Sequence, residues 1–206
     1  MTTTHKRSAQ APPKRRADAE RSVAAILDAA IDALADDPEA SMAEIARRAG
    51  VVRATVYVHF PTREALIAAV TERAMTEATE ALRAVAPDQG EPTEALTRML
   101  TETWRVLGPY HALVAINTRL APQRVRALHQ PILRQLRPLL KRGQQSGAFN
   151  PELPIEWMLT VLLELIHAAS HEYSTGTLPP DKAQAALIAT VLGALSTPHP
   201  QRRTGR

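Results

Sequence analysis

Apolar residues recur every three or four positions along most of this chain, which predicts α-helices throughout. The first such stripe begins near Asp18 and ends at Asp36-Asp37-Pro38, because a residue that precedes proline avoids the helical conformation. No segment shows the strict apolar–polar alternation of a half-buried strand, and no internal repeat is visible. The pattern therefore predicts an all-α protein.

Two short helices are expected after the first stripe. Ser41 is placed as an N-cap, and Glu44 three residues later is placed to complete a capping box. Gly50 marks the end of that helix. The next helix is expected from about Val52 to Phe60, and Thr62 is placed to cap the helix that follows.

Longer helices are expected in the rest of the chain. One runs from about residue 63 to 85, and residues 87–92 form the clearest linker. Pro131 either opens a helix at its first position or kinks a longer one, and Pro138 is expected to add a kink. The further helical segments lie near 93–107, 110–120, 122–130, 131–146, 154–174 and 180–196.

The composition excludes several classes of protein. The chain has 206 residues and no cysteine, which excludes disulfides, thiolate zinc sites and cysteine nucleophiles. It has no apolar run long enough to span a membrane and no secretion signal, so we expect a soluble cytoplasmic protein with no membrane partner. We find no glycine-rich phosphate loop and no nucleophile elbow, so we predict no catalytic residue, no cofactor and no enzymatic activity.

The basic charge of the chain lies mainly at its two ends. The formal net charge is +4, but residues 1–16 carry +5 and residues 197–206 carry +3, which leaves −4 for the body. The overall charge is therefore no argument for nucleic-acid binding, and only local clustering counts. One such cluster is the window 45–63, which holds four arginines and no acid.

The window 41–60 has the features of a helix-turn-helix. Two short helices flank the turn at Gly50, and Ala46 and Val56 supply apolar contacts between them. In a DNA-binding helix-turn-helix the second helix enters the major groove, and its N-terminal end contacts base edges. The alternative is a plain helical hairpin with a solvated arginine face. The predicted DNA-binding residues are Arg47, Arg53, Ala54, Thr55, Tyr57, His59, Thr62 and Arg63.

These residues also carry a resemblance to a known family. The stretch Ile45–Val51 (IARRAGV), followed by Thr55–Leu66 (TVYVHFPTREAL), resembles the N-terminal signature of the TetR family of bacterial transcriptional regulators. The resemblance covers about residues 20–70. Two positions depart from the common pattern: Val52 stands where many members have a capping Ser or Thr, and Val58 stands where many have a polar or basic residue.

The resemblance implies a homodimeric repressor that binds a palindromic double-stranded DNA operator. A small-molecule effector in the second domain is expected to move the fourth helices and release the DNA. The implied domains are a disordered basic arm at 1–17, a helix-turn-helix domain at 18–62, a connecting helix at 63–86, an effector-binding and dimerisation domain at 87–196, and a disordered tail at 197–206.

The last two expected helices are candidates for a dimer interface. Segment 154–174 is apolar nearly all round and is expected to be buried on several sides, whereas the small residues of segment 180–196 permit close approach of another helix. Two such helices from each subunit would form a four-helix dimer interface, as the resemblance also implies. The alternative is an ordinary core within one chain.

Three polar residues interrupt the apolar segment 154–174. Glu164, His167 and His171 are one helical turn apart and are expected to share a face. They are open to three interpretations: a structural pair, recognition of a cationic effector, or a metal site, which we do not predict because no fourth ligand is evident. Trp157 lies two turns before Glu164 on the same side, which suits a lipophilic cation.

Other polar and aromatic residues of the second domain are pocket candidates. Residues 103–151 contain eight basic residues and no acid, so an anionic effector remains an alternative to a cationic one. Two further alternatives are a DNA-binding regulator without an effector and a helical metal-dependent enzyme. The predicted effector-binding residues are Trp104, Tyr110, His111, Asn117, Trp157, Val161, Glu164 and His167.

Overall fold

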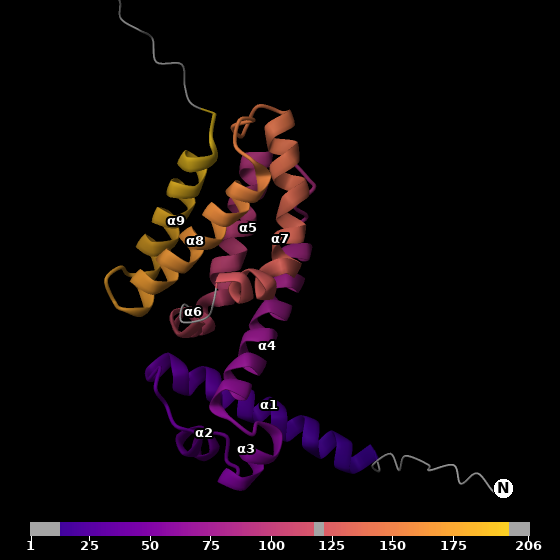
Figure 1. Ribbon diagram of the computed structural model, residues 1–206, viewed down its shortest axis with the longest axis vertical. Coiled ribbons are helices and arrows are strands. Elements are labelled where there is room, and N and C mark those ends of the chain that lie inside the picture. Colours follow the sequence, from indigo (N-terminus) through magenta and orange to yellow (C-terminus); the bar gives the residue numbers. More distant parts are fainter. Residues whose placement is uncertain (1–12, 118–121, 198–206) are drawn as a thin grey trace, which may run out of the picture.

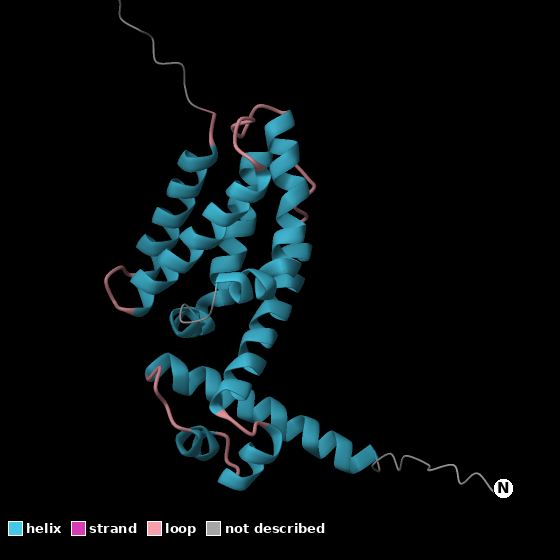
Figure 2. Ribbon diagram, viewed as in Figure 1, coloured by secondary structure: helices cyan, strands magenta, loops and turns pink. Residues whose placement is uncertain are grey.

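A computed structural model of the chain describes residues 13–117 and 122–197. These residues form nine α-helices and one short 3-10 helix, with no β-strand among them (Figure 2). A single isolated bridge pairs Phe149 with Ser196. The prediction of an all-α protein is confirmed. None of the helices in the described ranges is long and apolar enough to cross a membrane.

The helices are arranged as a small lower part and a larger upper part, joined by one long helix (Figure 1). In chain order they are α1 (Pro13–Asp36), α2 (Met42–Arg48), α3 (Arg53–His59), α4 (Arg63–Ala84), α5 (Pro92–Leu107), the 3-10 helix η1 (Gly108–Tyr110), α6 (His111–Asn117), α7 (Pro122–Gln145), α8 (Ile155–Ser174) and α9 (Pro180–Leu195).

The first helix starts earlier than the apolar pattern predicts. Helix α1 begins at Pro13, so the predicted disordered arm is wrong for residues 13–17. Proline is tolerated in the first turn of a helix, and the lysine, arginines and alanine that follow it are good helix formers. The rest of that arm, and the predicted tail from residue 198 on, lie outside the described residues.

Helix α7 is continuous through both of its prolines. The structure therefore selects the second of the two alternatives at Pro131, a long helix with internal proline, and the predicted division into 122–130 and 131–146 is wrong. Figure 1 shows the first part of α7 running across the molecule and the rest running along α4. Buried leucines such as Leu133, Leu136 and Leu140 follow the proline on its apolar face, and this packing stabilises the helix despite the missing amide donors.

Two hydrophobic clusters form the core, and α4 belongs to both. The lower cluster includes Ile26, Val56 and Leu66, together with Tyr110 and Leu113 from η1 and α6. The upper cluster joins the second half of α4 to α5, α7, α8 and α9. The α1–α3 region therefore packs directly on residues of the larger part as well as on α4.

Candidate nucleic-acid interface and inner cavity

The two short helices α2 and α3 are held by local sequence signals. The Ser41 hydroxyl accepts a 3.2 Å hydrogen bond from the Glu44 amide, which confirms the predicted N-cap. Gly50 adopts φ +67°, a left-handed conformation that favours glycine and turns the chain between the helices. Val56 is fully buried and fixes α3 against the lower cluster. These contacts leave the opposite face of α3 exposed.

Arg53 and Tyr57 form a pair on the exposed face of α3. The Arg53 guanidinium donates a 3.1 Å hydrogen bond to the Tyr57 hydroxyl, and its carbon lies 5.3 Å from the centre of the tyrosine ring. This cation–π contact orients the guanidinium at the N-terminal end of the helix. Ala54 beside it is exposed, whereas Thr55 and His59 are half-buried. The structure thus presents one oriented cation and one phenol together.

The two valines that depart from the family pattern are both on the surface. Val52 is 70% exposed and Val58 is 78% exposed. Val52 occupies the N-cap of α3 without a side-chain capping bond. Exposed methyl groups on a reading helix are able to contact the C5-methyl group of thymine, which is an apolar mode of base recognition.

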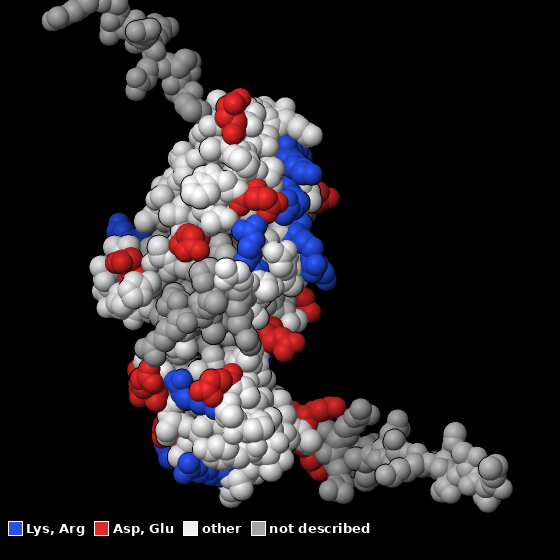
Figure 3. Space-filling model, in the orientation of Figure 1, with Lys and Arg blue, Asp and Glu red and all other residues white. Residues whose placement is uncertain are grey.

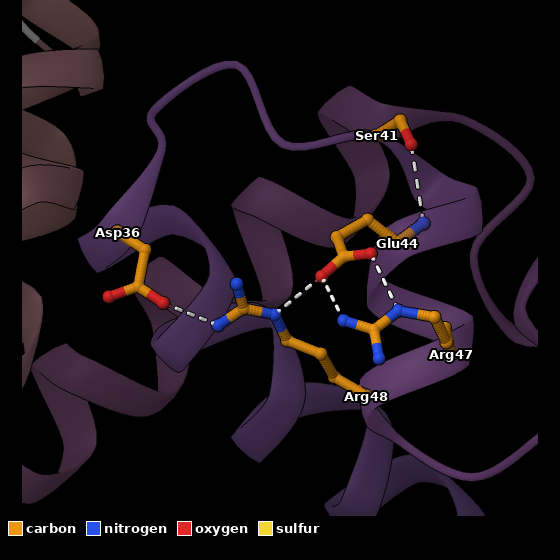
Figure 4. Close-up of polar contacts among 5 residues, drawn as sticks. All are labelled: Asp36, Ser41, Glu44, Arg47 and Arg48. Carbon is orange, nitrogen blue, oxygen red and sulfur yellow. Dashed lines mark hydrogen bonds and ion pairs between the residues drawn. The ribbon is translucent and has the colours of Figure 1, made fainter.

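Glu44 binds both arginines of α2 (Figure 4). Its carboxylate accepts bonds of 2.7 and 2.9 Å from Arg47 and 2.9 Å from Arg48, and Arg48 also pairs with Asp36 at 2.7 Å. These guanidinium bonds lower the pKa of Glu44 to about 2. The four arginines of window 45–63 are therefore not four free positive charges, because acids just outside the window pair with two of them.

The Glu44 carboxylate therefore faces the arginines and not the Ser41 amide that a capping box requires. Only the Ser41 half of the predicted box forms. Arg63 is also occupied within the chain. Its guanidinium donates hydrogen bonds to the backbone carbonyls of Pro38 and Ala40, so it holds the α1–α2 loop against the start of α4. Thr62 caps α4 as predicted, accepting a 3.1 Å bond from the Ala65 amide.

An aromatic cluster is buried between α5, α6 and α8. The His111 ring lies 4.3 Å from the Trp104 ring and 4.8 Å from the Tyr173 ring, measured between centroids. Its Nδ1 is 3.0 Å from the Ser170 hydroxyl. Burial lowers the pKa of His111 to about 4, so the ring is neutral at physiological pH. Two predicted effector-binding residues, Trp104 and His111, thus meet in one cluster.

A small inner cavity of about 40 Å³ lies next to this cluster. Of the predicted effector-binding residues, only His167 lines it, and its ring is 5.2 Å from that of His129. Burial, together with the positive charge of His129, lowers the pKa of His167 to about 4. The lining contains no carboxylate: it consists of Met75, Thr103, Leu107, Val114, His129, Ile132, Leu133, Leu136, Leu162, Leu163, Ile166 and His167.

Sequence reasoning missed two polar residues of this cavity, Thr103 and His129. Thr103 is one of several polar residues in the α5 segment, and its sequence position does not distinguish it from the exposed ones. The run that contains His129 reads as part of a solvated basic helix. Only the apolar residues around His129 in the first half of α7 could have indicated a half-buried ring. The side chain of Asn117, another predicted residue, lies outside the described residues.

The remaining candidates on α8 face away from the cavity. Trp157 is 55% exposed, Glu164 and His171 are exposed, and Val161 lies between them on the same stripe. The prediction that Glu164, His167 and His171 share a face is therefore wrong. Because α8 is apolar nearly all round, its sequence does not indicate which side faces the interior. In the described ranges no group of three or more acidic or histidine side chains is placed to hold a metal ion.

The exposed stripe of α8 continues onto α9. The α9 residues on this surface are small: Ala185, Ala186, Ala189, Thr190, Gly193 and Ala194 are all exposed. Helices α8 and α9 pack closely against each other. Helix α9 thus exposes small side chains, and its neighbour α8 exposes a tryptophan.

A chain of polar contacts connects α1, α4 and η1. Arg73 on α4 pairs with Asp28 on α1 at 2.6 Å and with Glu77 on its own helix at 2.9 Å. The Tyr110 hydroxyl donates a 2.8 Å hydrogen bond to the other oxygen of Glu77. Burial raises the pKa of Tyr110 to about 12, with a further contribution from the Glu77 charge, so the phenol stays protonated and remains a donor.

The basic residues of α7 are gathered along one side of the larger part (Figure 3). Two of them, Arg126 and Arg137, bind the carboxylate of Glu156 on α8. Arg134 and Lys141 are exposed. Much of this cluster therefore forms a solvated surface with structural ion pairs.

Known proteins resemble the chain in both sequence and fold. Residues 26–70 match the family model of bacterial regulatory proteins, tetR family. The HTH-type transcriptional repressor LfrR of Mycolicibacterium smegmatis is 29% identical over 178 residues, which cover 86% of this chain and 92% of that protein. The HTH-type transcriptional regulator NfxB of Pseudomonas aeruginosa is 28% identical over 137 residues, or 66% of this chain and 73% of that protein.

A solved structure shows the same architecture. The crystal structure of the TetR-like regulator LfrR from Mycobacterium smegmatis, in complex with proflavine, matches with a TM-score of 0.69 and 27% identity. The match covers 87% of this chain and 98% of that one. The similarity therefore extends through the larger helical part as well as the helix-turn-helix.

Proposed function

We propose that this chain is a ligand-responsive member of the TetR family of bacterial transcriptional regulators, and that it acts as a dimeric repressor that leaves a palindromic operator when a small molecule opens its inner cavity. The observation that carries this proposal is the position of α4. The same helix contributes Met75 to the cavity and Leu66 to the core beneath the helix-turn-helix. A change in the cavity therefore acts on the helix that supports the helix-turn-helix.

In the proposed complex α3 lies in the major groove. Arg53 and Tyr57 are oriented as a pair on its exposed face, and a guanidinium in that position suits a guanine edge or a phosphate. Val52 and Val58 supply apolar contacts beside it. Arg47 is 72% exposed at its side chain and joins the interface if a phosphate displaces Glu44.

The proposed dimer forms through the exposed surface of α8 and α9. Small side chains allow the helices of two subunits to approach closely, and Trp157 supplies apolar area at the edge. A palindromic operator requires two reading helices about 34–36 Å apart, one turn of DNA. A small displacement of α4 in each subunit changes that spacing and weakens binding.

Effector binding requires the inner cavity to expand. Pockets for small molecules usually measure about 300–1,000 Å³, and this cavity holds only about 40 Å³. Because α4, α5, α6, α7 and α8 all contribute to its lining, an entering molecule must spread these helices. Proflavine, the ligand in the LfrR complex, is a suitable first probe. The imidazole rings of His129 and His167 would face such a planar molecule.

The decisive experiment measures DNA binding with and without the probe. An operator is selected from a pool of random duplexes, and its dissociation constant is measured by fluorescence anisotropy. Tyr57→Ala removes the partner of Arg53 and should weaken binding, with a smaller salt dependence if phosphate contacts are lost. Leu163→Trp, which fills the cavity, should keep operator affinity and lose the response to proflavine.

Ala35→Glu, on the exposed side of α1, is the control for a surface change elsewhere in the chain. Undiminished operator binding by Tyr57→Ala would show that α3 is not the reading helix. A proflavine response that survives Leu163→Trp would place the effector outside the inner cavity.

A further inference from the structure

A second cavity lies between the last turn of α4 and α7. It has a volume of about 330 Å³, within the usual range for small-molecule sites. None of its lining residues also lines the inner cavity. The lining consists of Arg83 from α4, Pro87 and Asp88 from the α4–α5 loop, and Gln135, Pro138, Leu139 and Arg142 from α7. We call this the α4–α7 cavity.

The wall of this cavity contains a buried acceptor without a partner. The side-chain amide of Gln135 donates a 3.0 Å hydrogen bond to the Thr79 carbonyl. That carbonyl can only accept, so the amide nitrogen must face it and the oxygen must face the other way. The Gln135 Oε1 is buried and has no hydrogen-bond partner within the described residues. A buried acceptor without a hydrogen bond lowers the free energy of unfolding, and a bound molecule with a hydroxyl or amide donor would remove that cost.

The same wall contains a buried donor without a partner. Arg142 donates from its two terminal nitrogens to the carbonyls of Pro87 and Asp88, while its Nε–H is buried and unbonded in the described part of the chain. Both bonded partners are neutral carbonyl groups. The positive charge of Arg142 therefore has no carboxylate bonded to it there.

A second guanidinium lies at the edge of the cavity. Arg83 is exposed, and none of the ion pairs found among the described residues involves it. Asp88 is the single acid of the lining, so the two arginines leave the cavity with a net positive charge. The remaining walls, formed by Pro87, Pro138 and Leu139, are apolar. The cavity thus combines two cations, one free acceptor and an apolar surface.

We propose that the α4–α7 cavity binds a small amphipathic carboxylate. The carboxylate pairs with Arg83 and accepts from Arg142, the apolar body packs on the two prolines and Leu139, and a hydroxyl group on the ligand donates to Gln135. This site is additional to the inner cavity of the proposed repressor mechanism. Because Arg83 belongs to the last turn of α4, a ligand bound there contacts the far end of the helix that supports the DNA-binding region.

The test uses three probes of nearly equal size: octanoate, octanamide and 3-hydroxyoctanoate. Binding to the full chain is measured by isothermal titration calorimetry. We expect octanoate to bind more tightly than the neutral octanamide, and 3-hydroxyoctanoate to bind more tightly than octanoate. Arg83→Gln should weaken octanoate binding about three- to tenfold, a range that allows for the exposure of this side chain. It should leave octanamide binding unchanged.

Two further variants complete the test. Arg134→Gln removes an exposed charge from α7 outside the cavity and should leave octanoate binding unchanged. Gln135→Leu removes the free acceptor and should abolish the advantage of the hydroxy acid over octanoate. Failure of octanoate to bind, or equal binding by wild type and Arg83→Gln, would overturn the proposal.

Leu163→Trp separates this proposal from the repressor mechanism. It fills the inner cavity and should not affect octanoate binding to the α4–α7 cavity. If this variant abolishes octanoate binding while Arg83→Gln does not, the carboxylate occupies the inner cavity. The α4–α7 site is then wrong, although the proposed function still stands.

Discussion

The hydroxyl of Tyr110 donates a 2.8 Å hydrogen bond to the carboxylate of Glu77, and this bond joins the 3-10 helix η1 to α4. Through Arg73 the same carboxylate is connected to Asp28 on α1. The larger part of the molecule therefore contacts the DNA-binding region through a polar chain as well as through the apolar core. This chain makes the relative placement of α1 and α4 dependent on the position of η1.

Removing this hydrogen bond should lower stability. Tyr110→Phe keeps the buried ring and loses the hydroxyl, so the free energy of unfolding should fall by about 1–2 kcal/mol, as for a hydrogen bond to a charged acceptor. Urea unfolding followed by circular dichroism gives the value. Tyr57→Phe is the matched control, because its hydroxyl is at the surface and should contribute little. Equal losses in the two variants would argue against a special role for the Tyr110–Glu77 bond.

Glu44 should restrain DNA binding. Glu44→Gln removes the charge that holds Arg47, so Arg47 becomes available to a phosphate and DNA affinity should rise, whereas Arg48 keeps its ion pair with Asp36. For each new phosphate contact the slope of log K against log salt should steepen by about 0.9. Anisotropy titrations over a salt series measure both quantities.

Glu20→Gln serves as the control for that experiment, since it removes the same charge from an exposed position of α1. If the two variants gain equally, the effect comes from net charge and not from release of Arg47. If Glu44→Gln binds DNA more weakly than wild type, its main role is to hold α2 in place.

Stability should fall in mildly acidic solution because of buried histidines. The pKa of His167 is about 4 in the folded protein against 6.5 for an unperturbed histidine. The unfolded chain therefore takes up this proton first, and the stabilisation present above pH 6.5 is lost progressively as the pH falls toward 4. His111 acts in the same direction.

The prediction is tested by urea midpoints between about pH 7 and about pH 5, where most carboxylates remain ionised. His167→Leu should reduce the loss of stability over this interval, because one of the two depressed groups is gone. An unchanged pH dependence in the variant would mean that folding does not lower the pKa of His167.

A charge on the α8–α9 surface should prevent dimerisation. Ala189→Glu places a carboxylate on the exposed small-residue face, and in a two-fold dimer two such charges would be buried close together. Multi-angle light scattering should then report monomers, whereas Ala35→Glu on α1 should remain dimeric. A variant that stays dimeric would place the interface on another surface of the chain.

The helix-turn-helix could be predicted from sequence because its signals are local. The Ser41 cap, the turn at Gly50 and the Thr62 cap each depend on residues within three positions of one another, and all three are found in the structure. Some partners of its arginines could not be predicted from local sequence signals, because they lie far away along the chain. Arg63 binds carbonyls more than twenty residues away, and Arg48 reaches Asp36 across a loop.

The inner cavity could not be predicted in the same way. Helix α8 is apolar on nearly every side, so its sequence has no polar face that would identify the side exposed to solvent. The packing against α7 and α9 decides that His167 faces inward and Glu164 outward. An interpretation that joined Glu164 and Trp157 into a cation site therefore placed the effector on a surface that the structure leaves outside the core.

The two prolines of α7 make this helix easier to bend than α8 and α9, the other two long helices at the C-terminal end of the larger part. Pro131 and Pro138 lie two turns apart; Pro138 lines the α4–α7 cavity, and Pro131 lines a separate hollow between the middle of α4 and the first half of α7. At both positions the helix lacks an amide bond of its own ladder, so bending there meets less resistance than in α8 or α9, which contain no internal proline. We therefore expect a displacement beside α4 to bend α7 more readily than α8 or α9, whose exposed surface is the one proposed to join the subunits. Such a difference would let one side of the molecule deform without loosening the proposed dimer.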